Sequence, residues 1–146
     1  DMLAARPVPA DARCPVCGMY PARFPNWAAQ IIFSDGSAHF FDSPVDLFAF
    51  LDEPARFDAE HTADDDAALY VADHRSGGWL DARKAVFVIG SGVRGPMRGP
   101  DLPAFAEAAA AQAFIAEHGG RALAFDEIDR STVRDLRSAA HSGHMH

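Results

Sequence analysis

The residues most able to do chemistry lie near the N-terminus, in the segment Cys14-Pro15-Val16-Cys17-Gly18-Met19. Thiolate and thioether sulfurs are soft donors, and soft donors select Cu(I). In an extended segment the side chains of Cys17 and Met19 could face one ion, because side chains alternate with period two. Zinc would take Cys or His rather than Met as a further ligand. The residue chemistry therefore favours copper.

Two other interpretations of the cysteine pair stay open. A bare C-x-x-C is shared with thiol–disulfide redox proteins, and Cys14 and Cys17 could also be a structural disulfide or free thiols. A redox pair of the thioredoxin type begins a helix that follows a buried strand, where the helix dipole lowers the thiol pKa. Residues 1–13, which precede the pair, contain Pro7 and Pro9 and no hydrophobic periodicity. The sequence therefore supports a redox role for this cysteine pair less well than it supports a metal site.

A second sulfur candidate is Met97, within the Gly- and Pro-rich segment 94–100. A loop is a less natural place for a core methionine. If the loop lies near the cysteine segment, Met97 would complete a sulfur site of low coordination number. Arg94 and Arg98 flank this methionine and could guide an acidic docking partner, or could merely offset the negative charge of the chain locally.

The seven histidines supply further candidate ligands. His141, His144 and His146 fall within the last six residues, where they could capture copper or zinc. Among the scattered histidines, His39 on an expected strand and His74 at a strand end are the better candidates. No spacing motif fixes which histidine takes part.

Composition excludes several classes. The chain has 146 residues, 49% of them hydrophobic, and a net charge of 13 − 21 = −8, which argues against a nucleic-acid partner. No apolar run approaches the roughly 20 residues of a membrane helix. Two cysteines cannot build a disulfide-dense scaffold or a four-thiolate zinc site. Because the chain starts with Asp1, we expect a processed product, with any signal peptide or lipid-attachment cysteine upstream.

The elements that must position these residues follow a repeated pattern. Strands are expected at residues 27–33, 39–41 and 69–72 and again at 85–89, 102–105 and 122–125, with helices at 44–51, 107–118 and 132–140. Strand, strand, helix, strand therefore occurs twice, which predicts an α+β fold of two small ββαβ units with short antiparallel sheets and helices on one side. The expected division is a lead-in at 1–13, a first unit at 14–76, a second unit at 77–128, and a terminal helix with a His/Met tail at 129–146.

The chain resembles the NosL family of nitrous oxide reductase accessory proteins. The signature is the cysteine segment followed by Tyr20. Further matches are Gln30-Ile31-Ile32-Phe33 before Asp35-Gly36, Phe41-Asp42-Ser43-Pro44, residues 78–85, residues 88–91, Arg94-Gly95-Pro96-Met97 and residues 114–120. The resemblance covers residues 14–128 and implies a MerB-like fold of two ββαβ units.

The resemblance implies a Cu(I) chaperone rather than an enzyme. Its members are exported, commonly lipid-anchored in the periplasm, and supply copper for the copper–sulfide centre of nitrous oxide reductase together with an ABC-type assembly complex. Carried over residue by residue, Cys17 would be the thiolate anchor and Met19 and Met97 the neutral soft ligands. Cys14 would be a fourth ligand, a redox partner or incidental. The family also implies a histidine ligand and a second metal such as zinc. The alternatives are a periplasmic thiol–disulfide oxidoreductase and a zinc-binding interaction module.

Overall fold

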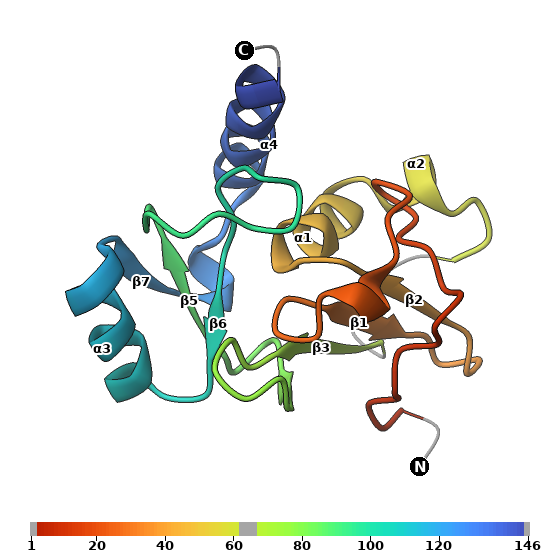
Figure 1. Ribbon diagram of the computed structural model, residues 1–146. Coiled ribbons are helices and arrows are strands. Elements are labelled where there is room, and N and C mark those ends of the chain that lie inside the picture. Colours follow the sequence, from red (N-terminus) through yellow and green to blue (C-terminus); the bar gives the residue numbers. More distant parts are fainter. Residues whose placement is uncertain (1–2, 62–66, 145–146) are drawn as a thin grey trace.

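The computed structural model describes residues 3–61 and 67–144, with side chains of the last helix up to residue 139. It contains two antiparallel sheets, one with four strands and one with three. Figure 1 shows them side by side, with α3 beside the smaller sheet, α1 near the centre and α4 rising away from both. In this part of the chain no helix has the length and apolar character needed to cross a bilayer.

The first unit is built from β1 (Ala29–Ile32), β2 (Ala38–Phe41), α1 (Pro44–Asp52), α2 (Pro54–Phe57), β3 (Ala68–Ala72) and β4 (Trp79–Asp81). Its strand order is β2-β1-β3-β4. The hairpin between β1 and β2 turns through Gly36, whose φ of +89° is a conformation that favours glycine. Pro44 opens α1 at the first helical position, where its missing N–H costs no bond. The predicted hairpin and helix are confirmed.

The second unit repeats this plan with β5 (Val86–Ile89), β6 (Ala104–Phe105), α3 (Ala108–His118) and β7 (Arg121–Ala124). Its order is β6-β5-β7, so in both units the first strand in the chain is central to the other two. Short 3-10 helices lie at η1 (Pro21–Arg23) and η2 (Phe125–Glu127), and α4 (Arg130–His144) closes the chain. The predicted α+β fold with a repeated ββαβ pattern is confirmed.

The boundary between the units differs in one strand from the predicted division. Residues 77–128 were assigned to the second unit, yet β4 pairs antiparallel with β3 in the first sheet. This strand is short and carries Trp79, Leu80 and Asp81, without the alternation that would indicate its partner. Its pairing is set by the tertiary structure.

The larger of the two hydrophobic clusters among the described residues joins the two sheets and includes Phe48 of α1. The Phe48 ring is 5.3 Å from the ring of Phe87 on β5 and 5.3 Å from that of Phe125. α1 also packs against α4, where Asp52 pairs with Arg130 and Arg134. The two units therefore depend on each other for burial of their apolar faces.

We expect Phe48→Ala to lower the free energy of unfolding by about 3–5 kcal/mol, because it leaves a cavity between both sheets. Urea unfolding measures this change. Phe57→Ala is the matched control, since Phe57 is only partly buried and stacks on Phe50 within the first unit. A loss below about 1 kcal/mol for Phe48→Ala, the size of an average substitution, would contradict a shared core.

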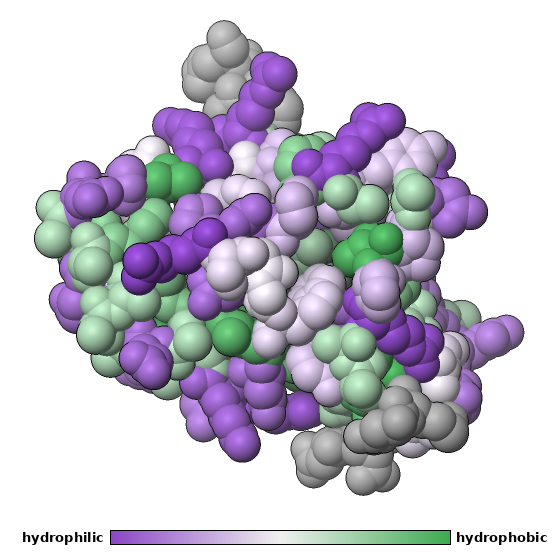
Figure 2. All heavy atoms as spheres, turned by 60° about the horizontal axis from the view of Figure 1, so that its bottom comes forward, coloured by the Kyte–Doolittle hydropathy of each residue, from purple (hydrophilic) through white to green (hydrophobic). Residues whose placement is uncertain are grey.

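Hydrophilic and apolar side chains are interspersed on the face of the molecule that Figure 2 presents. A pale green area lies on the side where Figure 1 places α3. The outward residues of α3 include Ala108, Ala109 and Ala113, which are exposed. Their small methyl groups make this an area of modest hydrophobicity.

Candidate metal centre

The cysteine segment forms a tight turn closed by two backbone hydrogen bonds. The Cys14 N–H donates to the Met19 carbonyl and the Gly18 N–H donates to the Cys14 carbonyl, both at 2.8 Å. Gly18 has φ +79°, a left-handed conformation that a residue with a Cβ adopts only with strain. The turn buries the Cys14 side chain and leaves Cys17 partly exposed, and both cysteines are free thiols.

Two aspartates of the first unit meet these thiols. The Cys17 thiol donates to Asp42 Oδ1 at 3.2 Å, and the Cys14 thiol donates to Asp46 Oδ2 at 3.5 Å. The ligand atoms of the four residues all lie within 4.8 Å of one another. Asp42 precedes α1 and Asp46 lies in its first turn, so the thiols face the helix end that stabilises negative charge. The cluster could hold a metal ion.

Burial and mutual hydrogen bonding shift the pKa values of this cluster. Desolvation, followed by a hydrogen bond with Asp42, raises the pKa of Asp46 to about 11. A hydrogen bond from Cys17 lowers the pKa of Cys14, while the same bond and burial raise the pKa of Cys17. Asp42 is fully buried, and its Oδ2 has no hydrogen-bond partner within the described residues. A bound cation would supply the partner that this oxygen lacks.

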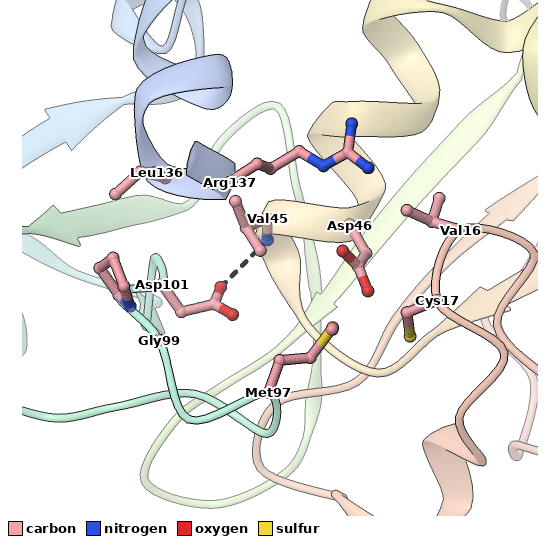
Figure 3. Close-up of a pocket in the computed structure, with 10 residues that line it drawn as sticks. Val16, Cys17, Val45, Asp46, Met97, Gly99, Asp101, Leu136 and Arg137 are labelled. Carbon is pink, nitrogen blue, oxygen red and sulfur yellow. Dashed lines mark hydrogen bonds between the residues drawn. The ribbon is translucent and has the colours of Figure 1, made fainter. Parts of the chain in front are cut away.

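Met97 reaches the same place from the second unit. A cavity of about 260 Å³ is bounded by ten residues: Val16, Cys17, Val45, Asp46, Met97, Gly99, Pro100, Asp101, Leu136 and Arg137. Figure 3 shows the side chains of Met97, Asp46 and Cys17 directed toward a common space. The structure therefore brings Cys17 and Met97, from different units, to one cavity.

The loop that carries Met97 is fixed to α1 by Asp101. This buried carboxylate accepts hydrogen bonds from the N–H of Val45 at 3.0 Å and from the N–H of Leu102 at 2.8 Å (Figure 3 draws the first). Ser43, at the N-cap position, makes no side-chain capping bond, so Asp101 caps the helix from a distance. Burial raises the pKa of Asp101 to about 7. A Cβ on Gly95 would lie 2.5 Å from Asp101 Oδ2. The loop can therefore come this close to Asp101 only because residue 95 is glycine.

Met19 and the histidines stand apart from this cavity. Met19 belongs to the turn, where its carbonyl closes the loop, but its side chain is not among those lining the cavity. His39 and His74 do not line it either. His39 pairs with Asp58 at 2.7 Å, and His74 packs among aromatic rings, with Nδ1 buried and lacking a partner in the described part of the chain. The side chains of His141 and His144, and all of His146, lie outside the described residues.

A second polar cluster surrounds His61. Its Nδ1 lies 2.8 Å from Asp58 and its Nε2 lies 2.8 Å from Asp35. Bonds to Asp35 and then Asp58 raise the pKa of His61, and bonds from Ser37 and then His61 lower the pKa of Asp35 to about 2. The His61 contribution to stability is complete below pH 6.5 and is lost as pH rises through its raised pKa. The Asp35 contribution is present above pH 3.8 and is lost as pH falls toward 2.

We therefore expect His61→Ala to destabilise the protein most between pH 3.8 and 6.5. The difference in urea midpoint between wild type and variant should shrink in alkaline solution, where His61 is neutral. Because the ring also stacks on Phe33 at 4.5 Å, a smaller, pH-independent loss should remain. A difference that stays constant from weakly acidic to alkaline pH would show that the ion pairs add nothing.

Sequence reasoning missed Asp42, Asp46 and Asp101. Asp42 stands in the Phe41-Asp42-Ser43-Pro44 segment, which carries the family resemblance but does not indicate that Asp42 meets the cysteines. Asp46 matched the general preference for an acid in the first helical turn. The available signal for Asp46 was its position between Val45 and Leu47, in a helix that is buried from Pro44 to Phe50. An acid inside such a helix needs a partner.

Comparison with known proteins gives consistent matches. The NosL family model matches residues 5–133. The copper-binding lipoprotein NosL of Stutzerimonas stutzeri is 34% identical over 141 residues, covering 91% of this chain and 70% of that protein. The copper-binding lipoprotein NosL of Achromobacter cycloclastes is 32% identical over 122 residues, covering 80% of this chain and 63% of that protein. The crystal structure of the copper chaperone NosL from Shewanella denitrificans superposes with a TM-score of 0.74 at 28% identity, covering 88% of this chain and 98% of the other.

Proposed function

Because this chain belongs to the NosL family, we propose that it is a Cu(I) chaperone that supplies copper for the copper–sulfide centre of nitrous oxide reductase. The observation that carries the proposal is the convergence of Cys17 and Met97 on one cavity. A thiolate and a thioether are soft donors. Such a pair suits Cu(I) better than it suits harder cations such as Zn²⁺. Copper is cargo here, so the site must release it as well as bind it.

The proposed copper ligands lie where donors from another molecule could replace them. Cys17 and Met97 are partly exposed at the cavity, whereas Cys14 is 2% exposed behind them. An incoming donor can approach from the cavity side and replace one ligand at a time. We therefore assign Cys17 as the thiolate anchor and Met97 as the exchangeable thioether, with Cys14 as a further donor from the buried side. Met19 stays a candidate ligand, reached through a side-chain rotation in its turn.

A zinc-type site is the second candidate, and one observation favours it. Cys14, Cys17, Asp42 and Asp46 offer two thiols and two carboxylates within 4.8 Å, a set that suits a four-coordinate cation harder than Cu(I). Elemental analysis after loading with each metal separates this possibility from copper. It also tests a second metal beside copper, for which His39, His74, His141, His144 and His146 are the candidate ligands.

We further propose a periplasmic location with a lipid anchor, and delivery to nitrous oxide reductase through its ABC-type assembly complex. The support for the anchor is that both curated relatives are named lipoproteins. We infer a carrier function with no catalysed reaction, since the matched proteins are named as copper-binding or as a copper chaperone.

X-ray absorption of the copper-loaded protein tests the proposal. We expect a Cu(I) edge and a first shell dominated by sulfur, with one sulfur fewer in Met97→Leu. Leucine matches the shape of methionine but cannot donate, so the fold should persist. A first shell of nitrogen and oxygen alone, or an unchanged sulfur count in Met97→Leu, would remove Met97 from the site.

A further inference from the structure

Three arginines around the cavity have no acidic partner among the residues that the structure describes. Arg137 lines the cavity, and Arg94 and Arg98 are exposed on the loop that carries Met97. Across residues 3–61 and 67–139, no carboxylate forms an ion pair with any of the three. The recorded bond of the Arg94 guanidinium goes to the Arg98 carbonyl within the same loop, at 3.3 Å. In a chain of net charge −8, this is a local concentration of uncompensated positive charge.

Other arginines of the same region behave differently. Arg130 and Arg134, on α4 with Arg137, both pair with Asp52 on α1. An acidic residue therefore lies within reach of Arg130 and Arg134 on this helix. Among the described residues, the arginines beside the cavity have no such partner. Unpaired arginines at a rim accelerate association with an acidic surface and orient it.

The interior of the cavity suits an apolar, sulfur-bearing side chain. Its volume of about 260 Å³ far exceeds the roughly 30 Å³ that one water occupies. Val16, Val45 and Leu136 form apolar walls, and Cys17 and Met97 also line the cavity (Figure 3). The carboxylate of Asp101 is engaged by backbone N–H groups, and that of Asp46 by the Cys14 thiol.

We infer that this face docks an acidic protein partner, which inserts a methionine side chain into the cavity to take over Cu(I). The inference rests on the proposed function and adds the chemistry of the acceptor. The partner thioether forms a Cu–S bond as the bond from Met97 breaks. The Cys17 thiolate takes a proton from water when its own Cu–S bond breaks. Copper remains Cu(I) throughout, so the exchange needs no oxidant or reductant.

The experiment uses the full chain loaded with Cu(I) and a blocked model peptide, Asp-Glu-Met-Glu-Asp. Two matched peptides replace the acids with lysines or the methionine with norleucine. We expect the acidic methionine peptide to remove copper fastest, with a rate that falls as salt is added. Arg137→Glu and Arg94→Glu should each slow this transfer about tenfold, and Arg94→Glu, whose side chain does not line the cavity, should do so with unchanged Cu(I) affinity. Arg121→Glu, an exposed arginine at the start of β7, is the control and should have no effect.

Three results would overturn the inference. One is equal transfer to the acidic and lysine peptides. Another is an equal effect of Arg137→Glu and Arg121→Glu. The third is a concentration-dependent dimer in sedimentation that Arg137→Glu abolishes, which would assign this face to a second copy of the chain. Failure of the proposed function looks different: the protein would not bind Cu(I), while the acidic peptide would still shift the amide resonances of residues 94–98 and 137 in the metal-free protein.

Discussion

Cys17→Ser should weaken Cu(I) binding by more than about 100-fold, because loss of a ligand exceeds the 10–100-fold cost of losing an outer-shell partner. A serine hydroxyl is a hard and neutral donor, whereas the Cys17 sulfur lies at the cavity as a thiol that can ionise on metal binding. Titration against a competing Cu(I) chelator measures the change in affinity.

Two matched variants test whether the loss of Cu(I) affinity is specific to the Cys17 sulfur. Val16→Ala removes a cavity wall without a donor and should change affinity by less than about threefold, a cost below 1 kcal/mol. Cys14→Ser should cost less than Cys17→Ser, because the Cys14 side chain is 2% exposed and does not line the cavity. Undiminished binding in Cys17→Ser would refute its role as anchor.

Asp101→Ala should reduce both stability and copper affinity. It removes the carboxylate that accepts from Val45 and Leu102 and so uncaps α1, at an expected cost of about 2–3 kcal/mol in urea unfolding. It also frees the Met97 loop from the helix, and we expect Cu(I) affinity to fall about 10–100-fold, as for other groups that orient a ligand. Asp101→Asn retains an oxygen acceptor and should recover part of both losses.

A double-mutant cycle distinguishes positioning from general destabilisation. If Asp101 acts through Met97, Asp101→Ala in a Met97→Leu background should lower Cu(I) affinity no further. Fully additive losses would mean that Asp101 influences the site by another route, such as the position of Asp46 at the start of α1.

The start of α1 illustrates how far the sequence leads. Ser43 and Pro44 predicted the helix start to the residue, because a small polar residue before proline is a local signal. The cap itself was not predictable: Ser43 makes no capping bond, and the acceptor comes from Asp101 in the other unit. Likewise, the two loop segments predicted Cys17 and Met97 as sulfur donors, but their common cavity depends on packing between units.

The other features that were not predicted from the sequence also depend on tertiary packing. The β4 strand is too short to carry a pattern, so its pairing with β3 had no local signal. No local pattern marks Asp46 as a site residue, because the burial of its helix face is a tertiary property. The strand prediction for His39 was right, but no local pattern indicates that Asp58 pairs with its ring.

The shared core between the two sheets has a thermodynamic consequence. Because Cys17 and Met97 meet only when both units are folded around Phe48, the denatured chain offers copper an incomplete set of donors. Copper binding should therefore raise the free energy of unfolding. A ligand that binds only the native state stabilises it by RT ln(1 + [L]/Kd). Loaded molecules resist heat and proteolysis better than empty ones. We expect unfolding to weaken the binding of the ion, because Met97 is then no longer held near Cys17.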